Sequence, residues 1–252
     1  MPLPYYNAKT DVGLVRNNNE DALLVSPSLK LWAVADGMGG HASGEVASAV
    51  ANITIEESIE AGASLSEAIQ RAHKAVLNEA TEQPQYRGMG STIVAVQSSG
   101  TQYQVAWVGD SRAYLWTHSQ LGRQLEQLTT DHSYVQMLYQ AGAITAKELN
   151  THPERNVITQ CLGSLELSSV NVETVDREWR KGDWLLLCSD GLTDAVGDQA
   201  ICDILSAHTE IPSAVDALVQ AALDNGGRDN VSVLIVSRPP TGFNRILRAL
   251  GV

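Results

Sequence analysis

Strand-like and helix-like segments of this sequence occur in blocks and do not alternate along the chain. Short runs rich in Val, Leu, Ile, Trp and Tyr predict strands at 31–35, 92–96, 103–108, 113–116, 184–188 and 231–236. Between the first two runs, apolar residues recur at helical spacing in 44–60 and 65–80, which predicts two successive helices. Parallel strands need a long crossover between neighbours, so blocks of this kind favour antiparallel sheets with segregated helices. The predicted fold class is α+β.

Local signals help to place the helix ends. Ser64 stands before the second helix and Glu67 follows three residues later, the pattern of a capping box. A further helical region covers 198–225 and should break at Pro212, which suits the first turn of a new helix. Gly226 follows this region and predicts its end.

The chain of 252 residues is long enough for one domain with its own core, which we expect to span 1–237. Within it, segment 133–160 is polar, with scattered Gly and Pro and only short helical stretches, and predicts a mobile flap. Residues 238–252 begin with Arg-Pro-Pro and continue with an amphipathic pattern, which predicts a linker and a short helix. That helix could pack on its own domain or dock on a partner or membrane surface.

The acidic composition argues against nucleic acid as a partner. The net charge is −12 and the isoelectric point about 4.8, so no positive field attracts a phosphate backbone. The cysteines Cys161, Cys188 and Cys202 lack CxxC spacing, which predicts neither a disulfide framework nor a zinc site. The chain shows no leader-like start and no apolar stretch near ~18 residues. We therefore expect a cytoplasmic monomer without a membrane span.

Aspartates follow three of the predicted strands. Asp36, Asp110 and Asp190 each stand beside a glycine where an apolar run stops, whereas Asp229 precedes the last run. In antiparallel pairs the end of one strand lies beside the start of its neighbour, so the four carboxylates are expected to converge. Oxygen ligands without His or Cys favour Mg, Mn or Ca over Zn or Cu, and Gly37 is the best candidate for a carbonyl ligand. A single Asp-Gly pair most often marks a plain turn, but its repetition favours a cation site.

Eight short motifs follow one another between residues 5 and 237. They are GLVR with NEDA at 13–22, VADGMGGH at 34–41, GST at 90–92, GDSR at 109–112, TDHS at 130–133, QCLG at 160–163, SDGLT at 189–193 and GRDNV at 227–231. Each motif alone is weak evidence for any one protein family. In this order they closely resemble the metal-dependent type 2C family of Ser/Thr protein phosphatases, particularly its compact bacterial members.

The resemblance implies a sandwich of two antiparallel β-sheets flanked by α-helices in α-β-β-α layers. It also implies a cleft at one end of the sheets for two core Mn²⁺ or Mg²⁺ ions, with a weaker third ion held by Asp110 and Asp190. Segment 133–160 would be the flap beside the cleft and would influence substrate choice.

The resemblance also assigns ligands for the two core ions. At the matching positions, Asp36 would bridge both ions, and Asp190 and Asp229 would hold the first. The carbonyl of Gly37 would hold the second ion, and Glu20 would contact that ion through water.

The implied reaction is hydrolysis of phosphoserine and phosphothreonine by attack of a water that bridges two Mg or Mn ions. A lone arginine most often forms a surface ion pair, but Arg16 lies four residues before Glu20, as in the family motif, and would grip the phosphate with its planar fork. His41 follows Asp36 by five residues and would protonate the leaving alkoxide. The expected partners are phosphorylated proteins, the substrates of a Ser/Thr kinase.

Other readings fit the residues less well. None of the cysteines has the phosphate-cradling loop of a covalent cysteine phosphatase, and no glycine-rich loop ends in Gly-Lys-Ser or Gly-Lys-Thr as in a P-loop enzyme. A catalytically silent pseudophosphatase that acts as a binding or regulatory module remains the alternative, although no ligand aspartate is missing. A structural calcium site leaves Arg16 and His41 without a role.

Overall fold

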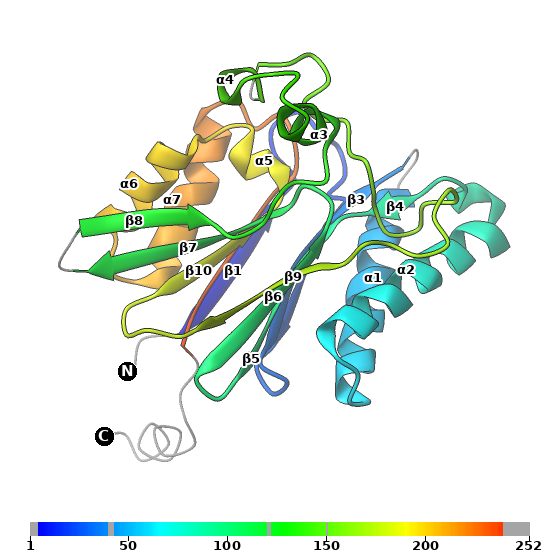
Figure 1. Ribbon diagram of the computed structural model, residues 1–252, viewed down its shortest axis with the longest axis horizontal. Helices are drawn as coiled ribbons and strands as arrows, with labels where there is room; N and C mark the ends of the chain where they lie inside the picture. Colours follow the sequence, from blue (N-terminus) through cyan, green and yellow to red (C-terminus); the bar gives the residue numbers. More distant parts are fainter. Residues whose placement is uncertain (1–4, 40–42, 120–121, 150, 239–252) are drawn as a thin grey trace.

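Two antiparallel sheets pack face to face and carry helices on their outer faces (Figure 1). The computed structural model describes residues 5–39, 43–119, 122–149 and 151–238. In the described part of the chain, the first sheet has the order β1-β11-β10-β7-β8. Its strands are β1 (Tyr6–Asp11), β11 (Val231–Ser237), β10 (Trp184–Cys188), β7 (Arg112–Ser119) and β8 (Gly122–Gln127).

The second sheet has the order β2-β3-β5-β6-β9, and a short strand β4 pairs with the end of β3. Its strands are β2 (Asp21–Ser26), β3 (Leu31–Met38), β4 (Gly90–Ser91), β5 (Ile93–Ser99), β6 (Gln102–Val108) and β9 (Glu173–Glu178). Every strand pair in both sheets is antiparallel. The predicted α+β class and the sandwich implied by the resemblance are both confirmed.

Helices cover the outer face of each sheet. The helices are α1 (Ser43–Glu60), α2 (Leu65–Glu82), the 3-10 turn η1 (Pro84–Tyr86), α3 (Tyr134–Gln140), α4 (Ala146–Leu149), α5 (Asp190–Thr193), α6 (Asp198–Ala207) and α7 (Ile211–Asp224). Helix α1 packs on β2 and β3, and α7 packs on β1 and β11. The predicted capping box of α2 forms, since Ser64 Oγ accepts from the Glu67 amide at 3.3 Å and Glu67 Oε2 accepts from the Ser64 amide at 2.9 Å.

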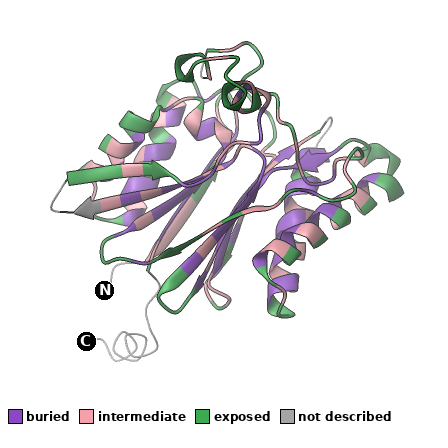
Figure 2. Ribbon diagram, in the orientation of Figure 1, coloured by how far each residue is buried: buried purple, intermediate pink, exposed green. Residues whose placement is uncertain are grey.

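Alternation along the central strands builds three buried layers. In β11, Val233 and Ile235 face the layer under α6 and α7, whereas Leu234 and Val236 face the layer between the sheets. Successive residues of a strand point to opposite faces, so a strand covered on both sides becomes a continuous apolar run. Figure 2 shows the resulting buried residues along the strand centres, with exposure increasing toward the outer surface of the helices.

Within the described residues, five strands were not predicted from the sequence: β1, β2, β4, β8 and β9. The two-residue β4 pairs with the end of β3, and the other four lie at sheet edges. Edge strands pair on one side only and often carry polar side chains, which weakens the apolar-run signal of β1, β8 and β9. Strand β2 does contain an apolar run, at 22–25, which the prediction missed. In β8 most residues are exposed, which explains its weak signal.

Segment 133–160 lies at one end of the sandwich and carries α3 and α4 (top of Figure 1). The short helical stretches predicted there are confirmed, while mobility of this segment stays a prediction. The predicted domain boundary at residue 237 coincides with the end of β11. Residues 239–252 of the predicted tail lie outside the described residues. Within the described residues, no helix has the length and apolar character required to cross a bilayer.

Candidate metal centre

One acidic pocket at the flap end of the sandwich gathers the predicted site residues. The pocket measures about 310 Å³. Seven of the eight predicted residues line it: Arg16, Glu20, Asp36, Gly37, Asp110, Asp190 and Asp229. His41 lies outside the described residues. The flap contributes Asn156 and Ile158 to the wall of the pocket.

Strand ends and starts bring the aspartates to this pocket. Asp36 lies near the end of β3, Asp110 follows β6, and Asp190 opens α5 directly after β10. Asp229 precedes β11, the antiparallel neighbour of β10, so it enters the end of the sheet at which Asp190 leaves. The convergence inferred from antiparallel pairing is therefore found in the structure.

Close backbone packing at Gly37 excludes any side chain there. A Cβ atom on this residue would lie 2.0 Å from the carbonyl oxygen of Gly44 and 2.5 Å from that of Glu20. The amide of Gly37 also donates to the Glu20 carbonyl at 3.1 Å. Glycine is thus required for the approach of the α1 start to the end of β3, which places Glu20 and Asp36 at the same pocket.

Burial and like charge act together on the carboxylates. Burial, with Asp21 and then Asp190 nearby, raises the pKa of Asp36 well above its usual range. Burial, with Asp110 and then Asp229 nearby, has the same effect on the pKa of Asp190. Burial, followed by the charge of Asp131, raises the pKa of Asp110 to about 7. In the absence of a counter-charge, these carboxylates destabilise one another.

Arg16 supplies part of the counter-charge. Its Nη2 donates to Asp229 Oδ2 at 2.8 Å, and 52% of its side chain is exposed. This hydrogen bond and the charge of Asp229 raise the pKa of Arg16. The guanidinium therefore lies at the mouth of the pocket and keeps donor groups on the solvent side.

The carboxylates share a pocket without forming a closed ligand cage. In the described segments, no group of three or more His, Cys, Asp or Glu side chains is arranged to hold a metal ion by itself.

Comparisons with known proteins give the family. A profile described as protein phosphatase 2C matches residues 15–226. The chain belongs to the protein phosphatase 2C family. The resemblance inferred from the motifs is confirmed.

Several bacterial members of the protein phosphatase 2C family are similar over nearly the whole chain. This chain is 39% identical to the serine/threonine protein phosphatase PstP of Mycobacterium tuberculosis. The match covers 91% of this chain but only 44% of PstP. The chain is 35% identical to the serine/threonine phosphatase stp of Listeria monocytogenes, over 94% of this chain and 97% of the relative. The catalytic domain of PstP, solved in complex with two manganese ions, matches with a TM-score of 0.79 and 35% identity, covering 92% of this chain and 96% of that one.

Asn230 organises the pocket of this family member and was not among the predicted site residues. Its Oδ1 accepts from the Glu20 amide at 2.8 Å, and its Nδ2 donates to the carbonyls of Val12 and Asn18 at 3.0 and 2.9 Å. The side chain is buried, with 6% exposure. It therefore ties the loop before β2 to the start of β11. Its place directly after Asp229 in the GRDNV motif was the available sequence signal.

Replacement of Asn230 by alanine is expected to lower the free energy of unfolding by about 3 kcal/mol, because three backbone groups lose their partner. Thermal or urea unfolding measures this loss. Asn171→Ala is the matched control, since Asn171 is exposed and no side-chain bond is found for it among the described residues. Equal losses in the two variants would contradict the anchoring role.

His132 supports the backbone next to the acidic pocket. Its Nδ1 accepts from the Gly109 amide at 3.1 Å, and its Nε2 lies 3.4 Å from Glu173 Oε1. Burial lowers the pKa of His132, although the charge of Glu173 opposes this. An accepting Nδ1 requires the neutral ring, which fixes the backbone just before Asp110. Gln160 Nε2 also lies 3.0 Å from His132 Nδ1, and the Thr159 amide donates to the His132 carbonyl at 2.7 Å, so His132 contacts both the strand end and the end of segment 133–160.

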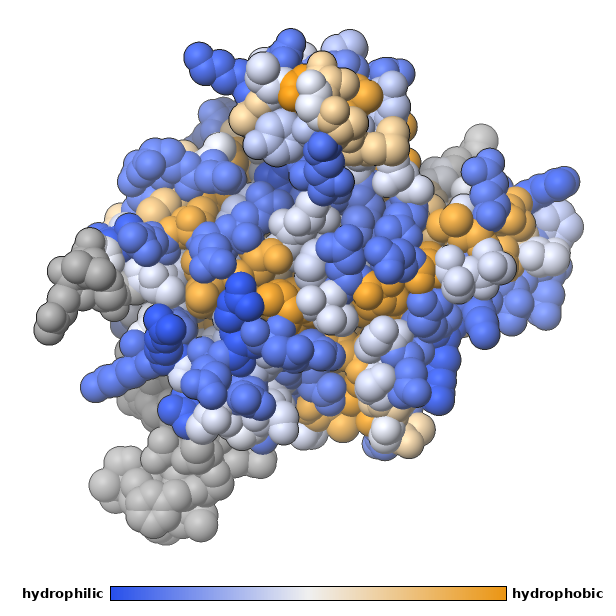
Figure 3. Space-filling view, in the orientation of Figure 1, coloured by the Kyte–Doolittle hydropathy of each residue, from blue (hydrophilic) through white to orange (hydrophobic). Residues whose placement is uncertain are grey.

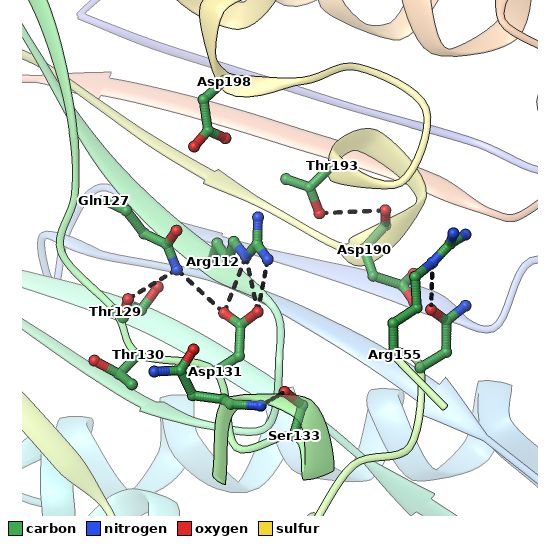
Figure 4. Close-up of polar contacts among 12 residues, drawn as sticks. Arg112, Gln127, Thr129, Thr130, Asp131, Ser133, Arg155, Asp190, Thr193 and Asp198 are labelled. Atoms are coloured by element: carbon green, nitrogen blue, oxygen red, sulfur yellow. Dashed lines mark hydrogen bonds and ion pairs between the residues drawn. The ribbon is translucent and has the colours of Figure 1, made fainter. Parts of the chain in front are cut away.

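A second pocket of about 370 Å³ lies between the flap and the sheet and adjoins the acidic pocket through Asp110 and Asp190. On its floor the Arg112 guanidinium makes a forked contact with Asp131, with Nη2 at 2.7 Å and Nε at 2.9 Å from the carboxylate oxygens (Figure 4). Gln127 Nε2 donates to the same carboxylate at 3.1 Å. The pair joins β7 to the base of the flap.

Proposed function

We propose that this chain is a metal-dependent protein serine/threonine phosphatase that hydrolyses phosphoserine and phosphothreonine. One observation carries the proposal: five carboxylates and Arg16, predicted from separate motifs, line one pocket at the end of the sandwich. Similar proteins named as serine/threonine phosphatases support this function over the pseudophosphatase alternative.

The donor set of the pocket fits Mg²⁺ or Mn²⁺. Its lining includes Glu20 and four aspartates against the single Arg16, a formal excess of four negative charges when all five carboxylates are ionised. No described His or Cys lines it, and hard oxygen ligands favour Mg²⁺ and Mn²⁺ over Zn²⁺ or Cu²⁺. The manganese ions of the PstP catalytic domain support the same choice.

We assign the metal ligands by their place in the pocket and in the family motifs. Asp36, with the Gly37 carbonyl and Glu20, would serve one part of the site, while Asp190 and Asp229 serve the other. Asp36 would be shared by two core ions. When bound, the ions would supply positive charge against the phosphoryl oxygens and lower the pKa of water for attack at phosphorus.

A weaker third ion is proposed beside Asp110, again with Asp190. Both side chains line the acidic pocket and the pocket under the flap, so they lie where the two volumes meet. This position lies on the flap side of the proposed core site.

Arg16 and His41 are proposed to act on the substrate itself. Arg16 presents a planar fork at the pocket mouth, where a phosphate ester can receive two parallel hydrogen bonds. Asp229 orients this fork by its own hydrogen bond to Nη2. His41, close behind Gly37 in the chain, is proposed to return a proton to the departing serine or threonine oxygen.

The remaining features of the proposal concern the cellular setting. We propose one phosphatase domain over 1–237 that acts as a monomer in the cytoplasm on proteins phosphorylated by a Ser/Thr kinase. Residues 238–252 would be a linker and an amphipathic tail. The acidic surface supports protein rather than nucleic acid as the partner.

Phosphate release from phosphopeptides tests the function. With saturating Mn²⁺, the protein is expected to dephosphorylate phosphothreonine and phosphoserine peptides of one common sequence, as followed by free phosphate. A peptide with phosphotyrosine at the same position serves as the comparison and should be a poorer substrate. If neither the phosphoserine nor the phosphothreonine peptide releases phosphate, and calorimetry confirms that metal is bound, the result would instead support the pseudophosphatase.

A further inference from the structure

A third pocket beside the acidic one is lined by arginines. It measures about 610 Å³, and Arg16, Arg155 and Arg228 line it together with Asp194 and Asp229. Three positive and two negative side chains leave an excess of one positive charge. The chain as a whole carries a net charge of −12, so the local excess in this pocket is opposite in sign to the net charge.

The two pockets are neighbours. Arg16, Asn156 and Asp229 line both of them, so the two pockets share a wall. The acidic pocket is the proposed site for the scissile phosphate. The arginine-lined pocket therefore lies within reach of residues adjacent to that phosphate in the substrate.

The arginines are carried by segments that are tied to the body. The Leu14 amide donates to the Gly227 carbonyl at 2.7 Å, which joins the loop of Arg16 to the loop of Arg228. On the flap side, Arg155 Nη2 and Asn156 Nδ2 both donate to Asp194 Oδ2, at 3.3 and 3.1 Å. Figure 4 shows Arg155 next to the segment that carries Asp190 and Thr193.

Arg228 is the arginine with spare capacity. The other two arginines already use some of their hydrogen-bond donors, since Arg16 donates to Asp229 and Arg155 donates to Asp194. For Arg228, no ion pair or side-chain hydrogen bond is found with any residue in the described ranges, and the residue is exposed. All of its guanidinium donors are thus available to a ligand.

We propose that this pocket binds a second phosphoryl group on the same substrate protein, so that doubly phosphorylated segments are preferred. The inference rests on the proposed phosphatase function and specifies its substrate class. A phosphorylated side chain carries about −1.5 to −2 charges and three acceptor oxygens, which matches several guanidinium forks better than a carboxylate does. The flap and the GRDNV loop would then both contact the substrate.

The hydrophobic surface near these loops is compatible with a peptide chain lying across them. Leu14 and Val15 are 69% and 65% exposed beside Arg16, and Val157 is 49% exposed beside Asn156. On the outer side of the flap, Figure 3 shows a further hydrophobic spot over α3 (orange, top of the view), where Met137 is 51% exposed. Apolar side chains that flank a charged pocket can contact the residues between two phosphates.

The test compares kcat/KM for pairs of phosphothreonine peptides of one sequence, with and without a second phosphoserine one to four residues away on either side. At one of these spacings, the wild-type protein is expected to prefer the doubly phosphorylated peptide by about tenfold, the scale of a charge-assisted contact at a partly exposed site. In Arg228→Gln the ratio of the two kcat/KM values should fall to about two. Arg71→Gln, which changes an exposed arginine on α2, should keep the wild-type ratio.

Each other outcome has a defined meaning. Equal kcat/KM values for both peptides at every spacing, or a preference that survives in Arg228→Gln, would overturn the second phosphate site. A glutamate in place of the phosphoserine that gives the full preference would show that a carboxylate is the ligand and would also overturn it. If no peptide is cleaved, the proposed function fails separately, and the pocket is then judged by fluorescence anisotropy. Equal affinity for singly and doubly phosphorylated peptides in that assay would reject it.

Discussion

Phosphate release by this protein is expected to stop after treatment with EDTA and to return when Mn²⁺ or Mg²⁺ is added. With all five carboxylates ionised, the pocket lining has a formal excess of four negative charges, which repels a phosphorylated substrate unless cations are bound. Phosphate monoesters are also very resistant to uncatalysed hydrolysis, so the loss should exceed roughly 1,000-fold. Ca²⁺ should not restore the activity, because it takes more ligands in a looser geometry.

The measurement is hydrolysis of a phosphothreonine peptide by the stripped protein with Mn²⁺, Mg²⁺, Ca²⁺ or no metal added. Circular dichroism before and after stripping shows whether the fold persists. Full activity in EDTA would exclude a role of metal in the reaction. Stabilisation by Ca²⁺ without turnover under any condition would favour the structural calcium site.

Asp36→Asn is expected to reduce kcat by more than about 1,000-fold at saturating Mn²⁺ while the protein stays folded. The amide keeps the shape of the side chain but removes the negative charge proposed to be shared by two ions. Its backbone amide still donates to Thr92 Oγ1, and Thr92 N to its carbonyl, at 3.2 and 2.8 Å. Asp36 is crowded by other carboxylates, so the metal-free variant should be at least as stable as the metal-free wild type.

Steady-state kinetics with increasing Mn²⁺ and thermal unfolding in EDTA check the two parts of this prediction. Asp203→Asn is the matched control, because Asp203 is exposed on α6 and bonds only Gln199 among the described residues. The control should retain wild-type rates. A normal rate in Asp36→Asn at saturating Mn²⁺ would remove Asp36 from the metal site.

The aspartates of the candidate site were largely predictable because each carries a local signature, whereas Glu20 was assigned only through the family resemblance. Asp36, Asp110 and Asp190 follow apolar runs, and antiparallel pairing brings strand ends and strand starts to the same edge. Those two facts require no coordinates. Asn230 was missed as a site residue because its role depends on carbonyls more than two hundred residues away in the chain, at Val12 and Asn18.

The strands also differ in how well the sequence predicts them. The central strands, such as β10 and β11, are covered on both faces, so both faces are apolar and the sequence shows an unbroken apolar run. The edge strands β8 and β9 are mostly exposed and owe their conformation to hydrogen bonds with β7 and β6. A strand that is held by its neighbour rather than by its own burial leaves little pattern in the sequence.

The sequence alone determined the α+β class, the main helices and the family motifs, since burial periodicity and turn chemistry are local properties of the chain. Only the tertiary structure decided that Arg16, Arg155 and Arg228 share a pocket, because they come from three distant loops. It also decided that Gly37 must be glycine, through carbonyl groups contributed by Gly44 and Glu20. Contacts between distant segments depend on how the layers pack, and packing acts on the folded surface rather than on the order of residues.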